Sequence, residues 1–213
     1  MSHWMMALSL DKVKSLNTND ILIIGGGKSI LDYELVSIID SFHTIGRINN
    51  YETNNFEKYI GSKTDIWFNG ANQGLKQRKE IPPRVVILIP PEILNKKGTK
   101  IHNRIIRRIN TDHYELVPIE IMSKFENDVK SQRLTTGTNS ILWALENFKR
   151  VFIHGFDFFI DSKTHYNDSK VKTWLIENGI ITKAQKHNNS QEKLYVENLI
   201  TQGKIIKLVD FLL

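Results

Sequence analysis

The stretch that decides the fold is ILIIGGGKSILDYEL, residues 21–35. Its β-branched opening predicts a buried strand, its three glycines a tight turn, and its apolar spacing from Ile30 onward a helix. A glycine turn between strand and helix can hold a phosphate, because N–H groups at a helix start point toward an anion. An ATP-binding P-loop also needs a glycine five residues before its Gly-Lys pair, where this chain has Leu22 inside the strand. The glycine turn is therefore not the phosphate-binding loop of an ATP-binding P-loop protein.

The alternation of strand-like and helix-like segments continues along the chain. Strands are expected at 21–24, 43–48, 65–69, 84–89, 114–117, 151–154 and 205–208. Helices are expected at 30–39, 91–108, 119–130, 138–148 and 190–202. Such βαβ units predict an α/β protein with a Rossmann-like, mostly parallel sheet and helices on both faces. We expect one domain over 1–213, in which the polar, irregular segment 155–188 has the length of an active-site lid.

Composition restricts the compartment and the partners. The chain has no cysteine, which excludes disulfides and cysteine-ligated zinc. Its longest apolar runs are too short to span a bilayer and its N-terminus lacks a signal-peptide pattern, so we expect a cytoplasmic protein. The net charge of +6 favours anionic partners, but nothing else supports nucleic-acid binding, and none is expected.

Basic residues concentrate at 95–108, where Ile101, Ile105 and Ile106 form an apolar stripe among cations. A solvated helix face is the simpler interpretation of this segment. The second hypothesis is contact with an anionic acceptor or peripheral contact with an acidic membrane surface, at the inner face of a membrane.

Polar or glycine-containing segments follow the strands at the edge where α/β sheets bind their ligands. They are 25–27, 47–50, 69–70, 133–138 and 154–157. Each alone is ordinary turn chemistry, but five at one sheet edge predict a nucleotide site. An NAD-dependent oxidoreductase is disfavoured, because the third fingerprint glycine would fall at Ile30.

These segments resemble, in the same order, the motifs of the CMP-sugar-dependent sialyltransferases of glycosyltransferase families 29 and 42. The matching stretches are IIGGGKSIL, GRINNY, GSKTDIWFN, QRLTTGTNSILWAL, VFIHGFDFF and HNNSQEKLYVENL, which together extend from residue 21 to about 205. The resemblance implies a GT-A-like variant of the Rossmann-like fold. It also implies transfer of sialic acid from CMP-sialic acid to a glycan, with inversion and without a metal.

The resemblance further implies that His187 and Tyr166 are catalytic residues. His187 takes the position of the general base, a task that suits a group with a pKa near neutrality. Glu192, five residues later, would cap the backbone or orient that histidine. Tyr166 and His165 resemble a His-Tyr pair that could hydrogen-bond the leaving phosphate.

The remaining site residues are positions implied to bind the donor. Asn49 and Asn69 match asparagines that contact phosphate or ribose, and Asp157 either closes its loop or contacts the ligand. One position departs from the family pattern, because Gly26 replaces the usual asparagine of the first turn and Lys28 follows it. The full set is Gly25, Gly26, Gly27, Lys28, Ser29, Asn49, Asn69, Arg133, Thr135, Thr136, Gly137, Thr138, Gly155, Phe156, Asp157 and His165.

The expected function is therefore that of an inverting, metal-independent sialyltransferase. No cofactor is expected, since the CMP-sugar is a co-substrate, and no metal site, since the chain has no Asp-x-Asp. Two alternatives stay open: another CMP-activated acidic sugar such as 3-deoxy-octulosonic acid, or a non-catalytic nucleotide-binding protein of the same fold. The acceptor is expected to be a glycan, with lipid-linked glycans and lipopolysaccharide as hypotheses. The sequence predicts neither linkage nor oligomeric state.

Overall fold

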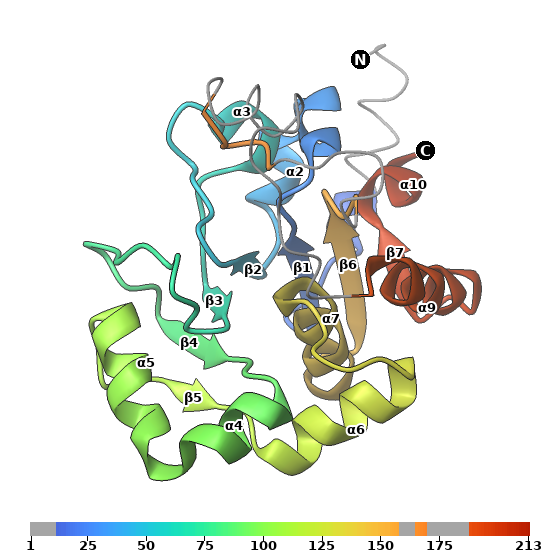
Figure 1. Ribbon diagram of the computed structural model, residues 1–213. Helices are drawn as coiled ribbons and strands as arrows, with labels where there is room; N and C mark the ends of the chain where they lie inside the picture. Colours follow the sequence, from blue (N-terminus) through green and yellow to red (C-terminus); the bar gives the residue numbers. More distant parts are fainter. Residues whose placement is uncertain (1–11, 158–164, 170–187) are drawn as a thin grey trace.

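A parallel sheet organises the protein (Figure 1). The computed structural model describes residues 12–157, 165–169 and 188–213. Within them, seven strands lie in the order β5-β4-β3-β2-β1-β6-β7, and every neighbouring pair is parallel. They are β1 Asp20–Ile24, β2 Thr44–Ile48, β3 Ile66–Asn69, β4 Arg84–Ile87, β5 Glu115–Leu116, β6 Arg150–His154 and β7 Ile205–Lys207. The predicted strands and the predicted parallel sheet are confirmed.

The strand order reverses beside β1. The chain runs outward from β1 to β5 on one side, then returns to place β6 and β7 on the other. In sheets of this kind ligands bind outside the carboxyl ends of the strands, at such a switch point. The predicted glycine turn follows β1 and therefore lies at the switch point.

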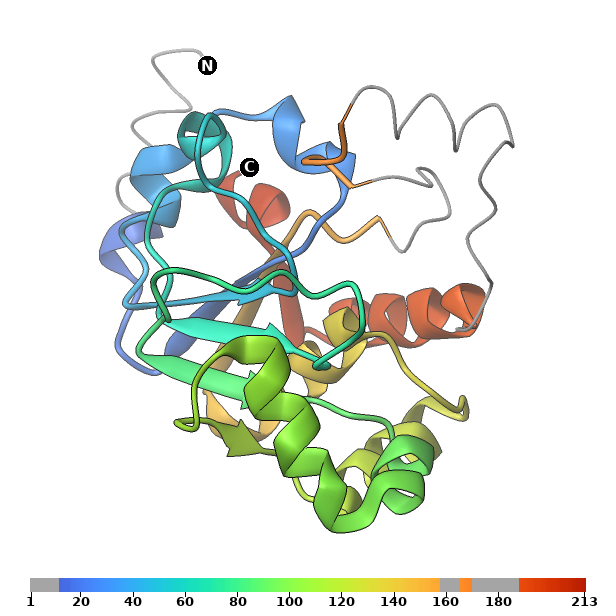
Figure 2. The ribbon, with the colours of Figure 1, turned by 60° about the vertical axis from the view of Figure 1, so that its left-hand side comes forward.

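Helices cover both faces of the sheet, as predicted (Figure 2). One face packs against α6 Ile119–Val129, α7 Thr136–Asn147 and α9 Asn189–Thr201. The other face packs against α2 Val36–Ile39, α3 Glu57–Ile60, α5 Ile101–Ile109, α10 Leu208–Leu212 and the short 3₁₀ helix η1 Lys28–Asp32. Beside α5 lie α4 Pro91–Lys97 and the 3₁₀ turn η2 Gly98–Lys100.

Two predicted helices are interrupted. The helix expected at 30–39 is divided into η1 and α2, and the helix expected at 91–108 breaks at Gly98. Gly98 has a φ of +49°, a conformation that glycine adopts without the steric cost borne by other residues. The short helices α3 and α10 were not predicted, and Leu208, expected at the end of a strand, begins α10.

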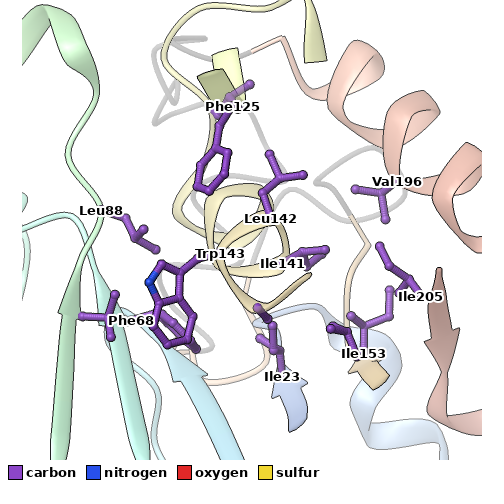
Figure 3. Close-up of a cluster of buried hydrophobic side chains, with 14 of the residues drawn as sticks. Ile23, Phe68, Leu88, Phe125, Ile141, Leu142, Trp143, Ile153, Val196 and Ile205 are labelled. Carbon is purple, nitrogen blue, oxygen red and sulfur yellow. The ribbon is translucent and has the colours of Figure 1, made fainter. Parts of the chain in front are cut away.

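The larger core cluster forms around α7 (Figure 3). Trp143 meets Phe68 of β3 edge to face at 5.3 Å, an arrangement that aromatic pairs prefer. Leu142 and Ile141 continue this cluster toward α6 and α9. Because α7 is buried on most of its sides, its N-terminus has a fixed position above the sheet edge.

The apolar stripe of the basic segment is part of the second face. Ile101 and Ile105 are buried against Trp67 and Ile87 of the sheet, whereas Ile106 is 40% exposed. Most of the stripe therefore belongs to the protein core, and contact of the segment with a membrane surface stays a prediction. Among the described residues, no helix has the length and apolarity needed to cross a bilayer.

Candidate active site

The turns after β1 and β6 touch through their backbones. The N–H of Gly25 donates to the carbonyl of His154, and that of Gly27 to the carbonyl of Gly155, both at 2.8 Å. A Cβ on Gly25 would lie 2.3 Å from the Gly155 oxygen. Gly155 itself has a φ of +72°, and a Cβ there would lie 1.9 Å from Cγ2 of Ile30. These glycines are required because the two chain segments approach too closely for side chains.

Asp157 closes the glycine turn. Its carboxylate accepts hydrogen bonds from the backbone N–H of Ser29, at 3.1 Å, and from the Ser29 hydroxyl. A Cβ on Gly27 would lie 2.3 Å from the Asp157 Cγ, so the carboxylate covers this glycine directly. Of the two roles left open for Asp157, the loop-closing one matches these contacts.

His165 explains why residue 26 is glycine. Its Nδ1 lies 3.3 Å from the Gly26 carbonyl oxygen, and a Cβ on Gly26 would lie 2.4 Å from the same nitrogen. The imidazole therefore occupies the space that an asparagine side chain would need. The next residue, Tyr166, donates its N–H to the Gly26 carbonyl at 3.1 Å.

The Tyr166 phenol joins two loops. Its hydroxyl donates to the Glu52 carbonyl at 2.6 Å and accepts from the Glu52 N–H at 2.9 Å. The side chain is buried edge to face with Phe56, and burial raises the pKa of Tyr166, which keeps the phenol protonated at neutral pH. The hydroxyl thus binds backbone in this structure, and its contact with a donor phosphate stays a prediction.

Arg47 was not selected from the sequence, although it lies in the GRINNY motif. Its side chain is fully buried and donates to the Lys63 and Ile60 carbonyls at 3.0 and 2.7 Å. Burial lowers the pKa of this guanidinium, and its Nη1 has no partner among the described residues. Arg47 holds the connection from α3 to β3, which fixes the strand end that carries Asn49.

The two predicted asparagines lie side by side at the sheet edge. Asn49 and Asn69 each come one residue after the paired Ile48 and Phe68 of β2 and β3. The Asn69 Oδ1 accepts from the Ala71 N–H at 3.1 Å, but its Nδ2 is buried without a described partner, as is Oδ1 of Asn49. Buried polar atoms are normally hydrogen-bonded, so these two atoms indicate that the edge binds a polar group.

The start of α7 is held by Glu192 of α9. The fully buried carboxylate accepts from the Thr135 N–H at 3.0 Å, from the Thr135 hydroxyl at 2.6 Å and from the Thr138 hydroxyl. A carboxylate is favourable here because the helix dipole is positive at its N-terminus. The two threonine hydroxyls are therefore engaged within the protein.

This contact corrects the prediction for Glu192. The N-cap of α9 is Asn188, whose Oδ1 accepts from the Gln191 N–H at 3.2 Å. Glu192 instead stabilises a different helix, 57 positions earlier in the chain. His187 lies outside the described residues, as do 158–164 and 170–187 of the predicted lid, so its orientation by Glu192 stays a prediction.

Phe156 and Arg133 extend toward different helices. Phe156 reaches α7, because a Cβ on Gly137 would lie 3.2 Å from its ring. Arg133 lies on the loop before α7, and its Nε is 3.2 Å from Oε2 of Glu92 on α4. Gly137 thus belongs with the glycine turns, whereas the Arg133 side chain extends toward α4.

Potential metal ligands are dispersed over the described part of the chain. Across 12–157, 165–169 and 188–213, no three histidine, aspartate or glutamate side chains gather into a group that could hold a metal ion.

Comparison with known proteins identifies the family. The profile described as glycosyltransferase family 29 (sialyltransferase) matches residues 5–204, nearly the whole chain. The chain belongs to glycosyltransferase family 29. It is a glycosyltransferase, and the α/β architecture predicted from its sequence is that of the family.

Relatives and solved structures agree with this assignment. Mouse and rat proteins named CMP-N-acetylneuraminate-beta-galactosamide-alpha-2,3-sialyltransferase 4 are each 23% identical over 236 residues, covering 94% of this chain and 67% of the relative. A mammalian sialyltransferase structure matches with a TM-score of 0.63 at 16% identity, over 98% of this chain and 86% of the other. A mammalian sialyltransferase in complex with Gal-beta-1-3GalNAc-ortho-nitrophenol matches with a TM-score of 0.62, also at 16% identity, over 96% and 84%. These structures confirm the Rossmann-like, GT-A-like fold.

The family 29 motifs recognised in the sequence meet at one sheet edge. The structure brings together the glycine turn, Asn49, Asn69, the start of α7 and the Gly155 turn. Sequence reasoning missed the contacts made by Arg47 and Glu192. A buried glutamate in a polar helix gives little local signal, and its threonine partners are distant in the sequence.

Proposed function

We propose that this family 29 enzyme transfers sialic acid from CMP-sialic acid to a glycan acceptor, with inversion and without a metal ion. One observation carries the proposal. Among the described residues, Oδ1 of Asn49 and Nδ2 of Asn69 are buried without a hydrogen-bond partner at the carboxyl ends of β2 and β3, the two strands next to β1 at the switch point of the sheet. A phosphate and a ribose offer the donors and acceptors that such atoms lack.

The leaving group is the phosphate of CMP. The glycine turn at 25–27 is packed against Gly155, His165 and Asp157, and the proposed place for the phosphate or ribose is beside it, at the amides of Asn49 and Asn69. His165, whose ring fills the place of a side chain at Gly26, supplies a hydrogen bond that the usual asparagine would have given. Tyr166 supports this region through its neutral phenol.

His187 is the proposed general base. It removes the proton of the acceptor hydroxyl, whose oxygen forms a bond to the anomeric carbon while the bond from that carbon to the phosphate oxygen breaks. Attack opposite the leaving group inverts the configuration at that carbon. His187 is followed by Asn188, the N-cap of α9, and Glu192 ties α9 to the start of α7. The family resemblance of Thr135, Thr136, Gly137 and Thr138 implies that this helix start faces the cytidine. One buried carboxylate thus connects the helix after the base with the proposed nucleotide site.

The hydrogen bonding of the nearby carboxylate supports the proposed metal independence. Asp157 stands beside the glycine turn, but both its oxygens accept hydrogen bonds from Ser29. The chain also lacks the Asp-x-Asp pair that would hold a divalent cation next to a nucleotide sugar. Charge on the departing CMP is then stabilised by amides, hydroxyls and N–H groups, which is electrostatic catalysis by preorganised donors.

A donor-hydrolysis screen tests this proposal. CMP-sialic acid, CMP-octulosonic acid, UDP-sugars and GDP-sugars are incubated with the enzyme, with and without EDTA, and release of the nucleotide is measured. We expect release of CMP from CMP-sialic acid, with most of the activity retained in EDTA. Turnover of CMP-octulosonic acid alone would support the alternative acidic sugar. Turnover restricted to UDP- or GDP-sugars would overturn the donor assignment, and loss in EDTA rescued by magnesium would overturn metal independence.

A further inference from the structure

The excess positive charge of the chain lies in one segment. The chain has 29 lysines and arginines against 23 aspartates and glutamates. Residues 95–110, here called the basic edge, contain no acidic residue and six cations, so 23 charges of each sign remain elsewhere. The cations are Lys96, Lys97, Lys100, Arg104, Arg107 and Arg108. The formal net charge of +6 is therefore a local property of this edge.

The basic edge is an outer surface of the protein. It comprises the end of α4, η2 and α5, which lie together at the opposite end of the molecule from α10 (Figures 1 and 2). The three lysines and Arg107 are exposed. Within the residues that the structure describes, none of the six cations forms an ion pair.

The cations are held close to one another by the fold. Arg104 donates to the Ala71 carbonyl at 3.2 Å and Arg108 to the Gln73 carbonyl at 3.1 Å. Burial, together with the neighbouring Arg108 and Arg107, lowers the pKa of Arg104. Like charges fixed next to one another repel, and an anionic surface relieves this repulsion.

The composition of the edge indicates which anion it binds. Residues 95–110 contain no Phe, Tyr or Trp on which a nucleic-acid base could stack, and the ring of His102 is hydrogen-bonded to the Tyr114 hydroxyl at 2.6 Å. Ile106 is exposed among the cations, and an apolar pocket of about 370 Å³, lined by Leu94, Ile101 and Val117, opens beside them. Exposed aliphatic groups beside clustered lysines and arginines suit a layer of lipid headgroups.

We propose that the basic edge docks on the anionic lipid surface of a membrane. The attraction is electrostatic, because Ile101 and Ile105, which an inserting helix would present to lipid, are buried in the protein. Docking would also bring the candidate site near the membrane, because Arg104 of the basic edge donates to the carbonyl of Ala71, two residues after Asn69. Membrane-borne acceptors would thereby come close to the site, a consequence that rests on the proposed function, whereas docking itself does not.

Vesicle flotation of the full chain tests the proposal. We expect binding to phosphatidylcholine vesicles that contain phosphatidylserine, little binding to phosphatidylcholine alone, and release at high salt, which screens exposed charges. Replacing Lys96, Lys97 and Lys100 by glutamine should lower the partition coefficient on the order of 100-fold. The matched control replaces Lys149, Lys204 and Lys207, three exposed lysines outside the edge, and should bind like the wild type.

Three outcomes would overturn the proposal. The first is absence of binding to the anionic vesicles, and the second is equal loss in both triple variants, which would make net charge the cause. The third is release of the protein from the vesicles by a trace concentration of soluble heparin. That release would indicate a site for a polyanion rather than for a lipid surface. Unchanged melting temperatures of the two variants exclude unfolding as the reason for lost binding.

Discussion

The two sides of the candidate site are held together in different ways. On the β1 and β6 side, the turns at Gly25 and Gly155 meet backbone against backbone, and the contact depends on the absence of side chains. On the α7 and α9 side, one buried carboxylate, Glu192, holds the helix start through Thr135 and Thr138. The first side is therefore sensitive to added volume, and the second to a change in charge.

The proposed general base, His187, precedes α9 in the sequence, and its removal should have the largest effect. His187→Ala should lower the turnover number by about 10² to 10⁴, the usual contribution of positioned proton transfer. Affinity for CMP should stay within a few-fold, because the base acts on the acceptor hydroxyl. Steady-state kinetics and CMP titration measure the two quantities.

The control is His43→Ala. His43 is exposed and precedes β2, at the opposite edge of the sheet from the proposed site. It should leave turnover unchanged. Near wild-type turnover in His187→Ala would remove His187 from the mechanism.

Volume added on the β1 and β6 side should cost the most stability. Gly155→Ala combines a φ of +72° with a collision against Ile30, and we expect a loss of about 3 kcal/mol in the free energy of unfolding. Gly203→Ala is a matched control, because its φ is +69° but no atom lies within 4 Å of the added Cβ; it should cost about 1 kcal/mol. Urea unfolding of both variants measures the difference. Equal costs would show that close approach is unimportant.

Charge removed on the α7 and α9 side should have a somewhat smaller effect. Glu192→Gln turns one acceptor oxygen into a donor group that faces threonine donors, and we expect a cost of about 2.5 kcal/mol. Glu197→Gln, on the same helix but exposed and 3.9 Å from Lys193, should cost no more than about 0.5 kcal/mol. If both changes cost the same, Glu192 does not hold α7.

The β1 and β6 side should also respond to pH. Burial lowers the pKa of His154 from 6.5 to about 4, although Asp157 opposes this shift. Below pH 6.5 the unfolded chain binds a proton that the folded His154 does not, so the free energy of unfolding decreases as the pH falls toward 4. Between pH 7.5 and 5 the loss from this residue should be about 2 kcal/mol. Denaturant unfolding of wild type and His154→Gln at both pH values measures it, and equal pH dependence in the two proteins would contradict this account.

The difference between local patterns and long-range contacts explains which features could be predicted from the sequence. The strands, their parallel pairing and the glycine turn follow from patterns within a few residues, and the structure agrees with the predictions for them. The sequence shows a glycine at position 98 but not that the helix ends there. The helix is interrupted because Gly98 has a positive φ in the folded protein.

Contacts between residues that are far apart in the sequence produce no local sequence pattern from which they could be predicted. Glu192 has the spacing of a residue that caps its own helix, yet its partner is the start of α7. Likewise, the roles of His165 and Gly26 become clear only when the imidazole is seen to occupy the space beside the glycine. The buried guanidinium of Arg47 is satisfied mostly by backbone carbonyls, which have no sequence signature.

The central claim is that this sheet edge binds the nucleotide of a CMP-sugar, and ligand-induced stabilisation tests it most directly. CMP at about 100 times its dissociation constant should raise the free energy of unfolding by about 2.7 kcal/mol, while ATP at the same concentration should raise it much less. The increase from CMP should shrink in Asn69→Ala, which lacks the amide nitrogen that has no partner among the described residues. Stabilisation by ATP with none by CMP would contradict the account and restore the P-loop interpretation of the glycine turn.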